Sequence, residues 1–328
     1  MTLAYRMHTK ADEPALIKLW SEYGGWDQVD AAAWAHRLLE TPVGPAKIVL
    51  ATNAETGEIV GQFAFIPSLV SVGGREVPAV RPFAPIMART GRDVVLTANP
   101  LEHPVVAMQM YAVKALREKG FELMYSVPDP QWAMFCRLFP NPQRHVGSFP
   151  LWSRPLPLPA PFPLEAGYTA GPLTPKGERV DRLWKAASKL YGCLVVRDSR
   201  GLPWKIGSGD YTVLGIEKGG ELVGLVASRA KGDGQWLVCD LLAAGGDGAL
   251  RATLAAVTNL ADAQARAAGP DRPITKVGIL ATRLLEPAAR ELGYGRDDYE
   301  FPLLVQTLGP DIKREDVAPE RWYVSAND

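Results

Sequence analysis

The sequence is poor in cysteine, in net charge and in long apolar runs. Its 328 residues include only Cys136, Cys193 and Cys239, too few and too scattered for a disulfide framework or a zinc site. Lysine plus arginine and aspartate plus glutamate each number 36, so no net field attracts nucleic acid or an anionic membrane. No run approaches the roughly 18 apolar residues of a membrane span, and residues 1–10 lack the apolar core of a signal peptide. These absences predict a soluble cytoplasmic protein that uses no metal.

What is present indicates two domains. Apolar residues make up 47% and charged residues 22%, as in globular proteins, and the length exceeds that of one ordinary domain. Residues 149–164, FPLWSRPLPLPAPFPL, alternate proline with apolar residues, which favours an extended connector over a helix or a central strand. We therefore predict an N-terminal domain over 1–150, a proline-rich linker over 151–165 and a C-terminal domain over 166–328.

The first half predicts two helices and three strands, followed by strand–helix pairs. Thr9 is a candidate helix cap before Asp12, and Gly24 is a candidate stop. The further predicted elements are a helix over 31–39, strands over 47–52, 58–67, 77–87 and 94–99, a helix over 104–119, a strand over 121–127 and a short helix through Trp132, Phe135 and Leu138.

The second half predicts the same order. Its elements are a helix over 176–191, strands over 211–217, 221–229 and 235–243, a long helix over 249–268, a strand over 274–281, a helix over 284–292 and a closing strand over 301–306. Such alternation predicts an α/β fold in which a mixed sheet has helices on both faces.

That order resembles the GNAT superfamily of acyl-CoA N-acyltransferases, duplicated in tandem. Residues 57–80, GEIVGQFAFIPSLVSVGGREVPAV, look like the paired strands of one of its subgroups. Residues 195–207, VVRDSRGLPWKIG, and 320–328, ERWYVSAND, resemble the second-domain signatures of that subgroup. The resemblance implies two tandem GNAT-like domains and a transferase that uses acetyl-CoA or another acyl-CoA as co-substrate.

Members of this superfamily bind the coenzyme A pyrophosphate at a Gln/Arg-x-x-Gly-x-Gly/Ala loop between a central strand and a long helix. Glycine lets backbone amides point at phosphate, and a helix N-terminus favours anions. In the first half the junction over 99–104 has no glycine and carries Glu102, and in the second half the arginine or glutamine is missing, so both loops are degenerate. The second junction is the better anion site, and its predicted cofactor-binding residues are Leu242, Ala243, Gly245, Gly246, Gly248 and Ala249. The alternative is a plain turn with Asp247 as the helix cap.

Asp240 is the first candidate catalytic residue. It lies in an apolar strand that leads into the glycine-rich junction, where desolvation would raise its pKa and suit it to act as a general base. A strand acid paired with an arginine or facing solvent is the alternative. His103 stands directly before a predicted helix, where a capping role and a catalytic role are both open.

Three further residues are candidates. Tyr125 and Tyr294 could reprotonate a leaving thiolate, although Tyr294 follows a glycine at a helix end, where core packing is common. Asp129 stands between two prolines at the carboxyl end of a strand, where open α/β sheets bind ligands. It could equally be a turn residue bonded to its own backbone.

The function that this resemblance implies is transfer of an acyl group, most simply acetyl, to the amine of a small molecule or of a sugar or amino-acid metabolite. The amine would attack directly in a cleft between splayed strands. Alternatives are transfer from a carrier-protein thioester or an aminoacyl-tRNA, and a non-catalytic binding module. Neither membrane nor nucleic acid is an expected partner, and a homodimer is compatible with the sequence. The acceptor, the acyl chain, the active half and the oligomeric state stay open.

Overall fold

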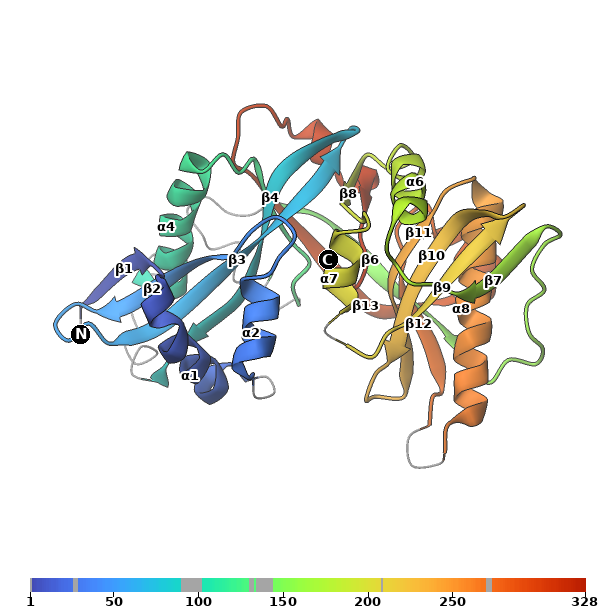
Figure 1. The fold of residues 1–328 in the computed structure, drawn as a ribbon, viewed down its shortest axis with the longest axis horizontal. Coiled ribbons are helices and arrows are strands. Elements are labelled where there is room, and N and C mark those ends of the chain that lie inside the picture. Colours follow the sequence, from blue (N-terminus) through green and yellow to red (C-terminus); the bar gives the residue numbers. More distant parts are fainter. Residues whose placement is uncertain are drawn as a thin grey trace. The chain divides into compact units, whose positions relative to one another are not determined.

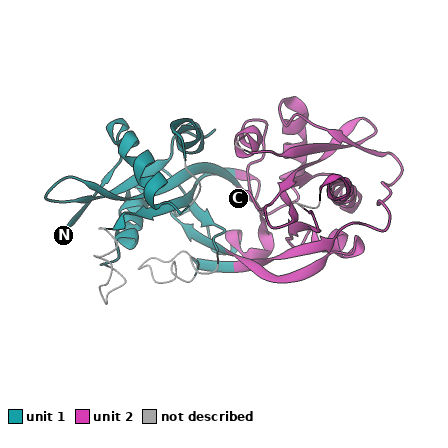
Figure 2. Ribbon diagram, turned by 90° about the horizontal axis from the view of Figure 1, so that it is seen from below, with its two compact units in different colours: residues 1–70, 76–146, 303–315 teal, residues 71–75, 147–302, 316–328 magenta. Residues whose placement is uncertain are grey.

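The computed structural model describes residues 2–25, 29–89, 102–129, 133, 144–207, 209–269 and 273–328. The chain divides into two compact units (Figure 2). Unit 1 comprises Met1–Val70, Glu76–Val146 and Leu303–Glu315, and unit 2 comprises Ser71–Arg75, Gly147–Pro302 and Asp316–Asp328.

Unit 1 is a mixed sheet with helices (Figure 1). Its strands, in spatial order, are β1 (Leu3–Met7), β2 (Lys47–Asn53), β3 (Ile59–Val72), β4 (Arg75–Met87), β5 (Leu123–Ser126) and the last residues of β13 (Gly295–Thr307). The β4–β5 pair is parallel, whereas β1–β2, β2–β3 and β5–β13 are antiparallel. The helices are α1 (Glu13–Tyr23), α2 (Ala31–Leu38) and α4 (Pro104–Glu118).

The start of α1 follows from its sequence. The Thr9 backbone amide and hydroxyl both donate to the Asp12 carboxylate, at 2.7 and 2.9 Å. Arg6 donates to both oxygens of the same group at 2.8 and 2.7 Å, and these bonds hold the pKa of Asp12 well below its usual range. Thr9 therefore caps a 3-10 turn, η1 (Lys10–Asp12), in a capping box with Asp12, and α1 begins directly after this turn with Leu16 and Trp20 buried.

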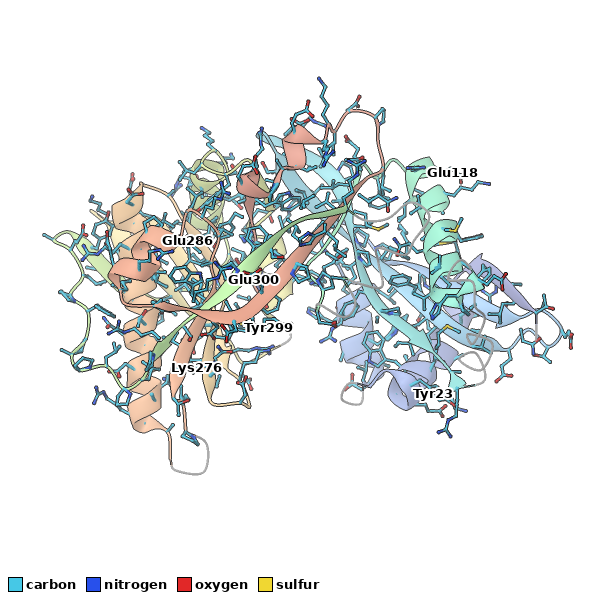
Figure 3. All side chains as sticks on the ribbon, turned by 180° about the vertical axis from the view of Figure 1, so that it is seen from behind. Tyr23, Glu118, Lys276, Glu286, Tyr299 and Glu300 are labelled. Carbon is cyan, nitrogen blue, oxygen red and sulfur yellow. The ribbon has the colours of Figure 1, made fainter. Side chains whose placement is uncertain are left out.

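Unit 2 contains the remaining strands of the mixed sheet. Its strand order is β13, β6 (Arg144–Pro155), β12 (Lys276–Leu280), β11 (Gln235–Ala243), β10 (Glu221–Ala230), β9 (Thr212–Lys218) and β7 (Tyr168–Pro172), with β8 (Cys193–Val195) paired to β14 (Trp322–Tyr323). The helices are α6 (Glu178–Ala187), α7 (Gly201–Ile206), α8 (Asp247–Ala267) and α9 (Glu286–Glu291). Tyr299 and Glu300 lie in the part of β13 that belongs to unit 2 (Figure 3). In the described part of the chain, no helix is both long and apolar enough to cross a membrane.

The predicted α/β class and the main order of both halves are confirmed. Besides β6, the strands and α-helices that sequence patterns missed are β1, β7, β8, β14 and α7, all six residues or shorter. Segments this short hold too few residues for a hydrophobic period to show. The predicted strand over 94–99 and the helix through Trp132, Phe135 and Leu138 lie outside the described residues.

The predicted connector over 149–164 is wrong in its first part. Strand β6 pairs antiparallel with β12 from Leu151 opposite Leu280 to Pro155 opposite Lys276, and Trp152 is buried. Because it lies between β12 and β13, this strand is central. Proline is tolerated because it still accepts a ladder bond, as the Pro150 carbonyl does from the Ala281 amide at 3.2 Å.

The remaining prolines follow an extended path that is fixed to α8. Asp262 accepts from the Leu158 amide at 2.6 Å, and Arg266 donates to the Leu158 carbonyl at 2.6 Å. Asn259 bonds both the amide and the carbonyl of Phe162, each at 2.8 Å. The predicted boundaries also differ from the units, since residues 71–75 belong to unit 2 and residues 303–315 return to unit 1.

Candidate functional site

The parallel strands in unit 2 separate before β11 ends. Their register runs from Gln235 opposite Lys276 to Val238 opposite Ile279, whereas β11 continues to Ala243. Against β10, the register shifts between Val238 and Asp240, so that Cys239 has no opposite residue and forms a β-bulge. The far half of β11 thus leaves β12 at its carboxyl end, where open α/β sheets bind ligands.

A glycine turn joins this strand to α8. Gly245 and Gly246 have φ of +108° and +79°, a region that favours glycine. The Gly246 carbonyl accepts from the amides of Ala249 and Leu250 at 3.1 and 3.3 Å, which starts the helix. Gly245, Gly246 and Asp247 are exposed, so the positive end of a 21-residue helix faces solvent. The turn has the geometry of an anion site.

Half of the predicted cofactor-binding residues cannot touch a ligand with their side chains. Leu242, Ala243 and Ala249 are at most 1% exposed. A Cβ on Gly248 would lie 2.9 Å from the Tyr168 hydroxyl, so this glycine lets Tyr168 approach the helix. The side chains of Leu242, Ala243 and Ala249 pack in the core, so any contact of these residues with a cofactor would come from their backbone groups and stays a prediction.

The charges beside the turn already have partners. Lys218 Nζ donates to Tyr168 Oη at 3.3 Å and lies 4.7 Å from the ring centroid. Arg251 pairs with Glu165 at 2.6 Å and with Glu291 at 3.2 Å. An anion at the turn would compete with Glu165 for Arg251.

The freed edge of β11 carries residues 322–328 of the same unit. The Tyr323 hydroxyl donates to the Leu241 carbonyl, and the Asn327 amide donates to the Cys239 carbonyl at 3.1 Å. Both acceptors lie beyond Val238, the last residue of β11 that pairs with β12.

Strand alternation shows which edge these carbonyls occupy. The Ala244 amide donates to the Val223 carbonyl of β10, so Ala244 faces β10. Successive residues of a strand face opposite edges, so Leu241, three residues earlier, faces away from β10. Residues 322–328 therefore lie along the edge that β12 leaves.

A buried ion cluster fastens that segment. Arg197 donates to Asp240 at 2.7 Å, to Asp328 at 2.5 Å and to Ser325 at 3.1 Å. Lys205 also bonds Asp328, and its Nζ lies 3.7 Å from Asp240 Oδ2. The side chains of Arg197, Asp240 and Asp328 are 0% exposed.

This cluster corrects the prediction that Asp240 is a general base. Asp240 is paired with a buried arginine, which was the alternative reading, and an amine cannot reach a carboxylate that has no exposed surface. Burial raises the pKa of Asp328, but the attraction of Arg197 and Lys205 outweighs it and leaves that pKa well below its usual range. The cluster thus consists of two cations and two carboxylates that neutralise one another.

Unit 1 contains a similar separation of parallel strands. Strands β4 and β5 pair only at Ala79 with Leu123 and at Val80 with Met124, although β4 runs on to Met87. The segment over 90–101, between β4 and α4, lies outside the described residues, so the predicted junction over 99–104 is described only from Glu102.

Strand β4 also bulges beyond the point of separation. The Pro78 carbonyl faces β5, because it accepts from the Glu122 amide at 2.8 Å. Ala88 faces β3, because its amide donates to Val60 at 2.8 Å. These positions lie an even number of residues apart and would face one edge in a regular strand. Ala84, with φ of +52°, marks the irregularity between them.

The other predicted catalytic residues are divided between the units, with Tyr294 in unit 2 and the remaining three in unit 1. His103 caps α4, since its Nδ1 accepts from the Val105 amide at 3.2 Å, and burial lowers its pKa. Tyr125 is 2% exposed within β5, and Asp129 is exposed just after β5 with its carbonyl accepting from Ala133 at 3.0 Å. Tyr294 shares a 2.7 Å hydrogen bond with Thr258 in unit 2, where burial raises its pKa.

No family model and no curated protein matches this sequence. Solved structures match over most of its length. A GCN5-related N-acetyltransferase from Anabaena variabilis superposes with a TM-score of 0.69 at 13% identity, covering 94% of this chain and 73% of that one. A tandem GNAT protein from the clavulanic acid biosynthesis pathway gives 0.57 at 15% identity, covering 95% and 100%. N-myristoyltransferase from Saccharomyces cerevisiae with bound myristoyl-CoA gives 0.59 at 12% identity, covering 93% and 79%.

The chain has the tandem GNAT fold. Within this GNAT fold, the residues that sequence reasoning missed are the partners of Asp240. Arg197 and Lys205 belong to 195–207, and Ser325 and Asp328 belong to 320–328, the two segments in which the family resemblance was found. The signal was present as charged residues in two short matching segments. The sequence did not show that Arg197 bonds Ser325 and Asp328, because these residues lie more than a hundred positions apart.

Proposed function

We propose that the protein transfers an acyl group from an acyl-CoA thioester directly to the amine of a small molecule. The tandem GNAT fold across 94% of the chain supports acyl transfer, because similar structures include N-acetyltransferases and a transferase with bound myristoyl-CoA. The fold supports acyl transfer in general, and we propose the amine acceptor and the acyl-CoA donor in addition.

We place the acyl donor in unit 1. The observation that carries this choice is that residues 322–328 already bond the freed β11 edge of unit 2. In unit 1 the corresponding edge belongs to β4 after Val80. A strand edge that has parted from its neighbour can pair with extended amide-bearing ligands, and the pantetheine arm of coenzyme A carries two amides.

The bulge in β4 suits the chemistry. When an amine attacks a thioester, negative charge develops on the carbonyl oxygen, and a fixed backbone N–H lowers the barrier by stabilising it. A bulge releases a backbone group from the strand ladder. We assign this donor to the backbone near Ala84, whose φ of +52° marks the bulge. The thiolate of coenzyme A leaves as the new amide forms.

Calorimetry with acetyl-CoA, octanoyl-CoA and myristoyl-CoA tests donor binding, and mass spectrometry after incubation with a panel of small amines tests transfer. We expect at least one thioester to bind and to yield an acylated amine with release of free coenzyme A. If no thioester binds, the protein is a binding module that keeps only the fold. A complex with the pyrophosphate at Gly245–Gly248 would move the donor to unit 2, as the glycine pattern predicts.

A further inference from the structure

The glycine turn and the freed β11 edge form one continuous path in unit 2. The turn begins directly after β11, and the carbonyls of Leu241 and Cys239 follow it back along the strand. A ligand with an anionic end and an arm that carries amides would fit such a path. Its anion would lie at the helix N-terminus, and its amides would donate to the strand carbonyls. In this structure the backbone amide of Asn327 already donates to one of those carbonyls, that of Cys239.

Residues 322–328 are held at this edge by more than the two edge bonds. Strand β14 pairs with β8 at Trp322 opposite Cys193 and Tyr323 opposite Leu194. The Tyr323 ring lies 4.7 Å from the Tyr191 ring, and the Arg197 guanidinium lies 5.0 Å from its centroid. The ion cluster then holds Asp328 at the far end of the segment.

We propose that residues 322–328 are an internal strap that occupies the acyl-donor path of unit 2, so that this path opens to a thioester only when the strap is released. The proposal rests on the proposed function, since it takes acyl-CoA as the ligand that the path fits. The strap supplies an amide and a hydroxyl to the same carbonyls that the ligand arm would use, so strap and ligand exclude each other.

Cys239 reports directly on the strap. Its carbonyl accepts from Asn327, and its thiol is 1% exposed in the bulge, where burial raises its pKa to about 11. Cys193 lies in β8 with its thiol bonded to the Asp316 carbonyl at 2.9 Å. Because Cys193 lies opposite Trp322 in the β14–β8 pair, release of the strap end over 324–328 exposes Cys239 alone, whereas unfolding exposes both thiols. Labelling with a thiol reagent, followed by peptide mapping, separates the two.

The test uses the full chain with Asp328→Asn, which leaves Arg197 and Lys205 facing one carboxylate. Asp298→Asn, at an exposed site of the same unit, is the matched control. We expect Cys239 labelling to accelerate at least tenfold in Asp328→Asn and to stay unchanged in the control. Calorimetric titration with the best-binding acyl-CoA should find one site per chain in the natural protein and two in Asp328→Asn.

Two results would overturn the strap. One is a natural protein that already binds two acyl-CoA molecules per chain. The other is a variant in which Cys239 becomes reactive while a single site persists.

If Asp328→Asn also exposes Cys193, the decision passes to Tyr323→Phe, which removes only the hydroxyl bond to Leu241. In that variant we expect faster labelling of Cys239 together with weak binding of a second acyl-CoA molecule. Faster labelling without a second binding site refutes the proposal. Absence of binding by every protein, the natural one included, would instead refute the proposed function, while faster Cys239 labelling would still report the strap contact.

Discussion

Strand β11 in unit 2 parts from β12 after Val238, and strand β4 in unit 1 parts from β5 after Val80. Each diverging strand bulges beyond that point, at Cys239 and near Ala84. The difference lies in what meets the freed edge, since the carbonyls of Cys239 and Leu241 bond residues 322–328. One architecture can therefore retain the geometry of a binding site while the chain itself fills it.

A short repeat makes the two units comparable residue by residue. Gly57–Gly61 reads Gly-Glu-Ile-Val-Gly, and Gly220–Gly224 reads Gly-Glu-Leu-Val-Gly. Each leads into the strand that precedes the bulged one. The last glycine has a different neighbour in each unit: a Cβ on Gly61 would lie 2.3 Å from Met87 Sδ at the end of β4, whereas one on Gly224 would lie 2.1 Å from Thr253 Oγ1 of α8.

The largest expected effect breaks the cluster that distinguishes unit 2. Asp240→Asn removes one carboxylate from a buried network, in which the Arg197 and Asp240 side chains are 0% exposed, and leaves the cations under-neutralised. Breaking a buried ion pair typically costs about 3–5 kcal/mol. We expect a loss of that order in the free energy of unfolding, measured by urea titration. The exposed Asp298→Asn should change it by less than about 0.5 kcal/mol.

The opposite outcome is equally informative. If Asp240→Asn keeps its stability and loses acyl transfer, Asp240 is a base after all and unit 2 is the active half.

The second prediction uses the matched glycines. Gly224→Ala forces Thr253 to move although its hydroxyl bonds the Ala249 carbonyl at 2.7 Å, and such overpacking costs about 1–3 kcal/mol. Gly61→Ala displaces the flexible end of Met87, so it should cost less stability and disturb the end of β4. We expect a raised KM for acyl-CoA in Gly61→Ala alone. A raised KM in Gly224→Ala instead would place the donor in unit 2.

Long periodic elements such as α1, α4, α8 and strands β9 to β11 are readable from the sequence, because their apolar spacing and glycine stops agree with the packing. Strand β6 is not readable in this way. Its prolines argue against a central strand, and the sequence does not show which backbone amides on the adjacent strands bond to it. Asp240 shows the same limit at the site. An acid in an apolar strand fits a base or a buried ion pair equally well, and only its long-range partners Arg197 and Lys205 decide between them.

The third prediction concerns acid stability. Burial raises the pKa of Asp262, but the bonds from Arg266 and the Leu158 amide outweigh it, so the folded pKa lies below the usual value. A lowered pKa in the folded state adds stability that is present above about pH 4 and is lost as the pH falls further. Asp262→Asn should therefore flatten the decline of the unfolding free energy between pH 5 and pH 3. A decline as steep as that of the natural protein would assign the acid response to other carboxylates.

The smallest expected effect concerns His103, which tests whether unit 1 uses it for structure or for chemistry. Its Nδ1 accepts from the Val105 amide at the start of α4, and burial lowers its pKa, so the neutral ring caps the helix at pH 7. Loss of a cap costs about 0.5–2 kcal/mol, and asparagine is a good cap in its own right. We expect His103→Ala to lower the midpoint of thermal unfolding and His103→Asn to restore most of it, with kcat similar in both. A kcat that falls equally in the two variants while His103→Asn remains stable would show that the imidazole takes part in proton transfer, and would make unit 1 the catalytic half.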